Sequence, residues 1–372
     1  MKIAYLGGSI FPSARASTVH MMKMCAAMVR ARHEVILFGR RSPGHVDADI
    51  FRYYGMDPTF ELDLVSNSLG LRLPALAGAA RLVTRATKFR PDLYYARRRP
   101  LAVVASFSST PLVFDAHELP IRMLHRRMES RIFNSRSFAC LVAVTQGLAN
   151  DYLDLWPQLR SKILVAPNGS DRVSESISPY AIASRPGVPQ VGYVGSLYPG
   201  KGMETTVKLA QRHDAIDFHV VGGDAQQVGY WQAKGCSGNI TFHGHVPHAD
   251  VSRYLSAFDV ALVPVQKRVA IDFDGSDIGK WTSPVKIFEY MAHGLPIIAS
   301  DLPTVREVLT NERNSILVPP EDIDAWSDAL TRLTLSTSFA EDLARRARED
   351  FLSKYTWDAR VSTVLKRALR KA

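Results

Sequence analysis

Cysteine is scarce in this chain of 372 residues. Its three cysteines, Cys25, Cys140 and Cys236, are odd in number and lie far apart, without the close spacing of a metal-binding motif. This pattern disfavours a disulfide-stapled secreted domain and a structural zinc site. We expect reduced, buried thiols in a cytoplasmic protein.

Long hydrophobic runs are also missing. No segment approaches the roughly 18 apolar residues of a membrane-spanning helix. The opening MKIAYLGGSIFP has too short an apolar run for a secretory signal and is expected to form a strand. An apolar content of 46% with 22% charged residues is typical of a soluble globular protein, and the length predicts two domains with substantial cores.

Two common nucleotide-binding motifs are absent. The glycines after the first expected strand, in GGSIFPSA, do not have the dinucleotide-binding pattern, so a dehydrogenase is the weakest functional hypothesis. The glycine-rich segment 195–202 does not have P-loop spacing. No aromatic-rich platform or DNA-reading motif accompanies the basic residues, which disfavours nucleic acid as a partner.

What is present is an alternation of strands and helices along the chain, which predicts an α/β fold with parallel sheets covered on both faces. Residues 171–189 are rich in Ser and Pro, lack periodicity and are expected to link two domains. An apolar stripe of Tyr355, Val361, Leu365 and Leu369 predicts a final helix. The expected strands are residues 2–6, 34–38, 93–95, 112–114, 141–144, 163–166, 191–194, 218–221, 240–242, 260–263 and 297–299.

The segment SPVKIFEYMAHGLPIIASD, residues 283–301, is the most informative. Ser283 is a favourable N-cap, Pro284 suits the first helical position, and Gly294 can end the helix. The free N–H groups at such a helix start attract phosphate.

Glu289 lies further along the same helix, where its carboxylate can accept hydrogen bonds from two neighbouring hydroxyls of a ribose. The alternative is an ordinary helix in which Glu289 only pairs with Lys286, three residues away. Together, the helix start and this carboxylate suggest a nucleotide-sugar pocket.

A second candidate phosphate loop occupies residues 190–210, which are expected to form a strand, a glycine turn and a helix. Gly195 permits close approach of the backbone, and Lys201 stands just before a helix expected near Gly202. A lysine at this point can reach a diphosphate as a point charge, although alone it is more often a solvated turn residue.

In the first half of the chain, Asp115, His117 and Glu118 follow an apolar strand. Such residues belong at the ligand-binding edge of an open sheet. His117 is our candidate for positioning donor and acceptor; the alternative is a loop histidine that bonds to backbone. Gly7 and Gly8 form a candidate opposing loop for a diphosphate or an acceptor, or a simple tight turn.

Taken in order, these segments resemble the fourth family of retaining glycosyltransferases. The resemblance covers nearly the whole chain, and although each segment is weak alone, their order and spacing are specific. The resembling segments are GGS (7–9), HEVILFG (33–39), PDLYYAR (91–97), VFDAHELP (113–120), VAVTQGLAN (142–150), APNGSD (166–171), the lysine loop (190–210), VVGGD (220–224), TFHGHVPHADV (241–251), FDVALVP (258–264) and the helix at 283–301.

The resemblance implies the GT-B fold, which has two Rossmann-like domains whose parallel sheets face a central cleft. It implies a basic, acceptor-binding domain at residues 1–170 and a linker at 171–189. A donor-binding domain would follow at 190–354, and a helix at 355–372 would cross back to the first domain.

The activity implied is that of a metal-independent retaining hexosyltransferase without a cofactor. It would move a sugar from a nucleotide diphosphate-sugar to an acceptor saccharide, lipid-linked in many related enzymes, in bacterial polysaccharide or glycolipid synthesis. The implied catalytic residues are His117, Lys201 and Glu289. The implied donor-binding residues are Gly7, Gly8, Ser196, Lys201, His245, Val246, Ser283, Pro284, Val285, Lys286 and Glu289.

His243, His245 and His248 also invite a metal hypothesis, which we disfavour because no carboxylate or cysteine completes the set. Two positions depart from the family pattern. Trp281 stands where the family has the first of two glutamates, so that Asp274 or Asp277 would have to replace it, and Ser196 stands where an arginine is frequent.

These departures leave two alternatives open. One is a non-catalytic subunit that binds a sugar nucleotide or polysaccharide. The other is an epimerase of the same fold, which requires acid and base carboxylates around the sugar and is disfavoured by Trp281. The sequence does not reveal the sugar, its nucleotide, the acceptor, the linkage or the oligomeric state.

Charge is distributed unevenly, since residues 1–170 carry a net charge of +11 and the remainder −1. Such a surface suits anionic lipid, which favours a cytoplasmic protein held on the inner face of the cell membrane. A solvated basic face without a partner is the alternative. The basic clusters are Arg81, Arg85 and Lys88, the run Arg97 to Arg99, and Arg122, Arg126, Arg127 and Arg131, the last group beside Ile121 and Leu124.

Overall fold

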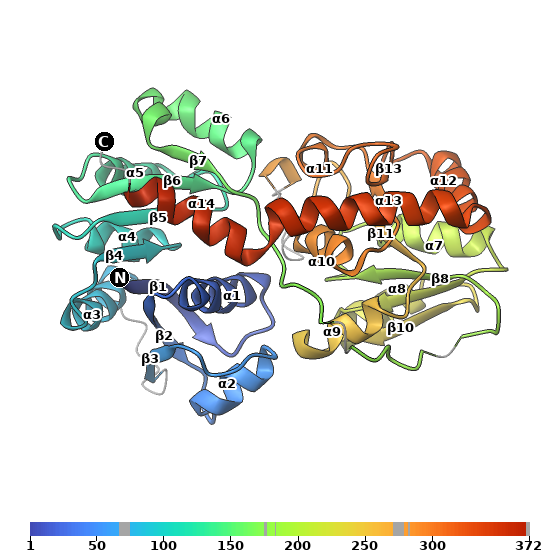
Figure 1. Cartoon of the computed structure of the whole chain (residues 1–372), viewed down its shortest axis with the longest axis horizontal. Coiled ribbons are helices and arrows are strands. Elements are labelled where there is room, and N and C mark those ends of the chain that lie inside the picture. Colours follow the sequence, from blue (N-terminus) through green and yellow to red (C-terminus); the bar gives the residue numbers. More distant parts are fainter. Residues whose placement is uncertain (67–74, 175–176, 183, 271–278, 282, 370–372) are drawn as a thin grey trace. The chain divides into compact units, whose positions relative to one another are not determined.

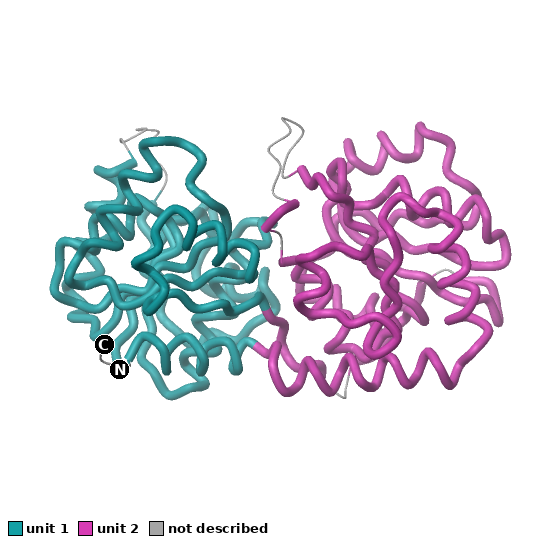
Figure 2. Tube along the Cα trace, turned by 90° about the horizontal axis from the view of Figure 1, so that it is seen from above, with its two compact units in different colours: residues 1–168, 357–372 teal, residues 169–356 magenta. Residues whose placement is uncertain are grey.

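The computed structural model traces an alternating α/β chain (Figure 1). It divides into two compact units (Figure 2). Unit 1 comprises Met1–Asn168 and Trp357–Ala372, and unit 2 comprises Gly169–Thr356. The residues that the structure describes are 1–66, 75–174, 177–182, 184–270, 279–281 and 283–369.

Unit 1 contains a seven-stranded parallel sheet in the order β3-β2-β1-β4-β5-β6-β7. The strand order reverses direction between β1 and β4, and the carboxyl ends of strands at such a reversal are where open α/β sheets bind ligands. The strands are β1 (Lys2–Phe11), β2 (Glu34–Arg41), β3 (Glu61–Ser66), β4 (Leu93–Ala96), β5 (Leu112–Ala116), β6 (Phe138–Ala143) and β7 (Ile163–Val165). The helices are α1 (Ala16–Arg30), α2 (Asp47–Tyr53), α3 (Ala75–Lys88), α4 (Arg99–Ala105), α5 (Met123–Phe133), α6 (Gln146–Leu155), the 3-10 turn Pro157–Ser161 and α14 (Trp357–Leu369).

Strand β1 is longer than predicted and irregular in its middle. Its pairing with β2 shifts between Leu6 and Ile10, so the glycines expected in a loop lie within the strand. Gly8 has a φ of 60°, and a Cβ there would lie 2.5 Å from Leu101 Cδ1. A residue without a side chain is therefore required at this bulge.

Unit 2 contains a six-stranded parallel sheet in the order β10-β9-β8-β11-β12-β13. The described sheets thus confirm two parallel α/β domains. The strands are β8 (Gln190–Val194), β9 (Asp217–Val221), β10 (Ile240–Gly244), β11 (Val260–Val263), β12 (Ile297–Ser300) and β13 (Ile316–Val318). The helices are α7 (Met203–Arg212), α8 (Ala225–Gln232), α9 (His248–Leu255), α10 (Val285–His293), α11 (Pro303–Arg306), α12 (Ile323–Leu335) and α13 (Thr337–Asp350), with the 3-10 turn Gly279–Trp281 and the π-helix Phe351–Tyr355.

The segment expected as a linker, 171–189, belongs to unit 2. In its described part, the ring of Tyr180 stacks on that of Tyr254 with centroids 4.3 Å apart, and the Tyr180 amide donates to the carbonyl of Arg253 at 2.9 Å. This part of the segment therefore packs against α9.

The final helix belongs to unit 1, where α14 packs beside α1 on the core. The predicted stripe was right for Val361 and Leu365, which are buried, but wrong at both ends. Leu369 is 50% exposed, and Tyr355 packs on the unit 2 core, its ring 5.3 Å from that of Phe288. Tyr355 lies apart from the stripe because the extended backbone of Thr356 separates the π-helix from α14.

Cys25 and Cys140 are buried free thiols, as predicted, whereas Cys236 is only partly buried. Burial raises the pKa of Cys140 to about 12. Among the described residues, no helix combines the length and apolar character needed to cross a membrane.

Candidate functional site

Two lysines come together in unit 2. Lys201 lies in the turn between β8 and α7, and Lys286 in the first turn of α10. The Lys286 Nζ atom is buried, lies 3.6 Å from the centre of the Tyr193 ring, and has no hydrogen-bond partner within the described part of the chain. A Cβ on Gly195 would lie 3.0 Å from this atom, so the β8 turn closes directly over it.

The electrostatics of the pair favour an anion. Burial lowers the pKa of Lys201 to about 8. Burial and then the charge of Lys201 lower the pKa of Lys286 well below its ordinary value. Neither lysine makes an ion pair with a described acid, so positive charge on one disfavours positive charge on the other in a poorly solvated site. An anion such as a phosphate would relieve their repulsion.

The start of α10 adds to this site. The helix begins at Val285 with Pro284 as its N-cap, so the prediction of Ser283 as the N-cap was wrong by one residue. Pro284 gives the helix start no side-chain cap, and within the described part of the chain no side chain is seen to accept from its first backbone N–H groups. Gly294 ends the helix in the left-handed conformation, with a φ of 63°, as predicted.

Glu289 is held by a histidine. His248 Nε2, on α9, donates to Glu289 Oε1 at 3.2 Å, and the Glu289 side chain is 13% exposed. Burial by itself would raise the pKa of Glu289, but the His248 hydrogen bond and the nearby positive charges hold it below the ordinary value. The alternative of a Lys286–Glu289 ion pair is not seen among the described residues.

The sequence indicated His248 only as a metal ligand, so its hydrogen bond to Glu289 was not predicted. The structure does not gather the three histidines of that hypothesis. His243 Nε2 lies 3.1 Å from His219 Nδ1, and His245 is exposed. Val246, expected to bind the donor, packs against the unit 2 core.

The two departures from the family pattern also lie in unit 2. Ser196 follows β8, and its carbonyl accepts a hydrogen bond from Tyr193 Oη at 2.8 Å. Trp281 is a partly buried residue of the 3-10 turn Gly279–Trp281. Asp274 and Asp277, the expected replacements for the missing glutamate, lie outside the described residues.

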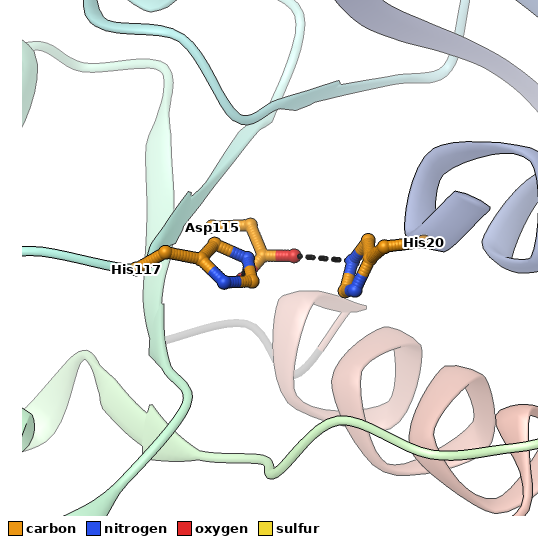
Figure 3. A group of neighbouring side chains, drawn as sticks. All are labelled: His20, Asp115 and His117. Carbon is orange, nitrogen blue, oxygen red and sulfur yellow. Dashed lines mark hydrogen bonds and ion pairs between the residues drawn. The ribbon is translucent and has the colours of Figure 1, made fainter. Parts of the chain in front are cut away.

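In unit 1, the partly buried His117 belongs to a group with the buried His20 and Asp115 (Figure 3). His20 Nε2 donates to Asp115 Oδ2 at 3.2 Å, and His117 Nε2 lies 3.3 Å from Asp115 Oδ1. Asp115 ends β5, His117 follows it, and His20 comes from α1. The potential ligand atoms lie within 4.8 Å of one another, a spacing that a metal ion can use.

The surrounding charges argue for an ion-pair network instead. Arg360 Nη2, from α14, donates to Asp115 Oδ1 at 2.9 Å and to Oδ2 at 3.0 Å, and Tyr95 Oη donates to Oδ2 at 2.8 Å. Burial would raise the pKa of Asp115, but Arg360 and His117 hold it well below its ordinary value. A divalent cation would have to displace this guanidinium contact.

The histidines are kept neutral. Burial, with the charge of Arg97, lowers the pKa of His117 to about 3. Burial also lowers the pKa of His20 to about 4, against the opposing hydrogen bond of Asp115. The group therefore presents a neutral imidazole next to an ionised carboxylate, which is suited to hydrogen bonding and proton acceptance rather than to carrying charge.

Comparisons with known proteins agree with this architecture. A family model described as "Glycosyl transferases group 1" matches residues 188–335, and one described as "Glycosyltransferase Family 4" matches residues 17–173. Together the two matches cover most of the chain.

Two curated relatives illustrate the range. The phosphatidyl-myo-inositol mannosyltransferase of Mycobacterium leprae is 28% identical over 218 residues, covering 56% of this chain and 54% of the relative. The 2-deoxystreptamine N-acetyl-D-glucosaminyltransferase of Streptomyces fradiae is 25% identical over 230 residues, covering 58% of this chain and 52% of the relative. The chain thus matches about half the length of these relatives.

Solved structures share the fold over almost the full length. Sucrose-phosphate synthase of Thermosynechococcus elongatus has a TM-score of 0.74 at 18% identity and covers 98% of each chain. Anabaena HepE in complex with UDP has a TM-score of 0.68 at 18% identity and covers 98% of this chain and 99% of its own. At this identity the likeness establishes the fold alone, and that fold is GT-B.

Proposed function

This chain belongs to the family 4 and group 1 glycosyltransferases, and on that premise we propose that it transfers a hexosyl group from a nucleotide diphosphate-sugar to an acceptor hydroxyl with retention of configuration. The observation that carries the proposal is the Lys201–Lys286 pair near the start of α10, where Pro284 gives no side-chain cap. A departing nucleoside diphosphate accumulates negative charge, and this pair with the helix start would stabilise it. The reaction would then need neither a metal ion nor a cofactor.

Glu289 would bind the ribose hydroxyls. Its carboxylate is ionised and partly occupied by His248, which fixes one oxygen and leaves acceptor capacity on the carboxylate for hydroxyl groups. Anabaena HepE was solved with UDP, which makes uridine diphosphate the first nucleotide to test here.

His117 is assigned, by resemblance, to the reacting sugar carbon. Its neutral imidazole would hydrogen-bond the sugar or the acceptor hydroxyl without adding a positive charge. The hydroxyl would attack from the face that the diphosphate leaves, and its proton would pass to the leaving phosphate. No nucleophilic carboxylate is required by this scheme.

We also propose that unit 1 rests on an anionic lipid surface. Ile121, Met123 and Leu124, at the start of α5, are 75%, 63% and 61% exposed, and the exposed Arg122 and Arg127 flank them. Apolar side chains among arginines suit a lipid interface. A lipid-linked acceptor in polysaccharide or glycolipid synthesis would fit such a surface.

Not every predicted basic cluster contributes to this surface. Arg99 is turned inward, where it pairs with Glu118 at 2.8 Å and Glu129 at 2.6 Å. Arg85 pairs with Asp63 at 2.7 Å.

Binding of the protein to anionic lipid is tested by sedimentation at low salt with vesicles of anionic or neutral phospholipid. An Ile121→Ser, Leu124→Ser variant should lose the anionic-vesicle binding, and equal binding to both vesicle types would contradict the proposal.

The proposed donor site is tested first, by measuring how nucleoside diphosphates and their sugars change the thermal unfolding midpoint of the protein. A ligand that binds only the folded protein must raise the midpoint as its concentration increases. A selective shift with one nucleotide and its sugars supports the donor site, whereas a flat response from folded protein contradicts it.

Trp281 favours one second candidate, a non-catalytic subunit that binds the sugar nucleotide, because the family's first glutamate is missing there. Release of nucleoside diphosphate that depends on an added acceptor separates the two. Nucleotide binding without such release supports the non-catalytic subunit.

A further inference from the structure

Four arginines lie at the carboxyl end of the unit 1 sheet. Arg40 is the next-to-last residue of strand β2, Arg97 and Arg98 follow β4, and Arg15 lies between β1 and α1. Within the described residues, none of the four side chains forms an ion pair or a hydrogen bond. Other arginines of unit 1 do pair with acids, such as Arg99 with Glu129 at 2.6 Å.

Three of these side chains gather around the bulge in β1. The β1–β2 register sets Arg40 opposite Ile10, directly after the bulge. On the other side, Arg98 Cδ lies 3.4 Å from where a Cβ on Gly8 would be. Burial, followed by the charges of Arg40 and Arg15, lowers the pKa of Arg98, so the guanidinium groups are close enough to repel one another. Gly8, which is partly buried, lies beside Arg98.

Arg97, which precedes Arg98, is one of three residues with a buried polar atom that has no hydrogen-bond partner in the described chain: Tyr5 Oη, Arg97 Nη1 and His117 Nε2. The His117 atom lies 3.3 Å from Asp115 Oδ1 but outside hydrogen-bonding geometry. Arg97 is the common neighbour, because its charge acts on both Tyr5 and His117. Buried donors without acceptors are rare in folded proteins and mark places where a ligand or water completes the bonding.

We infer that Arg40, Arg97 and Arg98 form an anion-binding subsite beside the Gly8 bulge, and that it takes a phosphate or carboxylate group of the acceptor. Guanidinium groups match the planar oxygen pairs of these anions and bind them with two hydrogen bonds. The assignment to the acceptor rests on the proposed function, in which the donor diphosphate is held by Lys201 and Lys286 in unit 2. A second cationic site in unit 1 is then left for the other substrate.

The test uses inorganic phosphate as the probe and the full chain as the protein. Arginines are modified with phenylglyoxal, and the rate at each site is followed by peptide mass spectrometry. Saturating phosphate is expected to slow modification of Arg40 and Arg98 by about fivefold or more, since bound anion excludes the reagent. Arg32 and Arg52, which are exposed and lie elsewhere in unit 1, are the matched controls and should react at an unchanged rate.

Two further arms identify the source of the anion. Saturating UDP should leave Arg98 reactive, and phosphate should still protect Arg98 in the presence of UDP and in Lys286→Ala protein. If phosphate protects neither Arg40 nor Arg98, the subsite is wrong. If UDP alone protects Arg98, or abolishes the effect of phosphate, the site serves the donor and the acceptor assignment is wrong.

A calorimetric titration with UDP keeps this outcome separate from the proposed function. UDP binding that depends on Lys201 and Lys286 supports the donor site, whatever phosphate does at Arg98. An Arg98→Gln variant should weaken phosphate binding about tenfold and leave UDP affinity unchanged, with Arg52→Gln as its control. Unchanged phosphate affinity in Arg98→Gln would overturn the subsite.

Discussion

Arg360 and Asp115 form an ion pair in which Arg360 Nη2 donates to both carboxylate oxygens, although 245 residues separate the two in sequence. The guanidinium comes from α14 and the carboxylate from the end of β5, and the two side chains are 2% and 0% exposed. Because His20 and His117 both contact this carboxylate, the pair orients the histidine proposed for catalysis.

Replacing Arg360 should destabilise the protein strongly. Arg360→Met leaves the Asp115 charge buried without its partner, which costs about 3–5 kcal/mol in the free energy of unfolding. Urea unfolding followed by circular dichroism measures this loss. Lys366→Met, an exposed position on the same helix, should change it by less than about 0.5 kcal/mol. Wild-type stability in Arg360→Met would show that the ion pair does not hold α14.

Both lysines of unit 2 should be needed for UDP binding, and Lys286 should also lower the stability of the unliganded protein. Lys286→Met removes a buried amino group that has no hydrogen-bond partner among the described residues, so it should raise the unfolding free energy by about 1–3 kcal/mol. The same change, like Lys201→Ala, should weaken UDP binding about 10- to 100-fold. Calorimetry measures the affinity, and Lys208→Ala, exposed on α7, is the control. Unchanged UDP affinity in both variants would remove the donor site.

Nucleotide affinity should fall at high pH. Because the pKa of Lys201 is lowered to about 8, its charge is nearly complete at pH 7 and is lost as the pH rises through 8. UDP affinity should therefore decrease between pH 7 and 9.5, by up to about tenfold per unit above the pKa. Lys201→Arg keeps its charge over this range and should bind with a weaker pH dependence. A flat profile for the wild type would contradict a role for the Lys201 charge.

Glu289 should matter for the nucleoside part of the donor. Glu289→Gln keeps the shape but removes the charged acceptor, and should weaken UDP binding about tenfold or more. His248→Ala frees the carboxylate and should have a smaller effect of the same sign. The measurement is a titration with UDP and with pyrophosphate. Loss of affinity for both ligands equally would place Glu289 away from the ribose, and the exposed Glu341→Gln is the control.

His117 should act on transfer and not on nucleotide binding. His117→Ala is expected to lower the rate of sugar transfer about 100-fold or more, as removal of a positioned hydrogen-bonding imidazole does. UDP affinity should remain as in the wild type. Because burial lowers the His117 pKa to about 3, its protonation should produce no step in the rate between pH 5 and 8. A normal rate in His117→Ala, with exposed His45→Ala as comparison, would refute the assignment.

Most of the fold could be predicted from the sequence because strands of parallel sheets are buried on both faces and therefore appear as apolar runs. Eleven of the strands were located in this way, and the two that were missed have a physical reason. β3 (Glu61–Ser66) is an edge strand with acidic residues at alternate positions, and β13 (Ile316–Val318) has only three residues.

The candidate site was predictable only where it is local. Lys201 and Lys286 stand next to glycine turns or helix starts, whose chemistry is visible in a few residues. The contact of His20 with Asp115 joins α1 to β5 across 95 residues, and that of Arg360 depends on the return of α14 to unit 1; no local pattern encodes either contact. His248 was missed because its partner, Glu289, lies 41 residues further along the chain.

The division of unit 1 into two stretches of sequence has a consequence for biosynthesis. A ribosome delivers residues 1–168 first, but Asp115 meets its counter-ion only after Arg360 has emerged, when all of unit 2 has already been made. Unit 2 is continuous and has every one of its strands before α14 appears. Domains generally fold as units during synthesis. Synthesis of unit 1 therefore begins first but ends last. In a nascent chain arrested before Arg360, unit 2 is complete in sequence, whereas unit 1 still lacks α14.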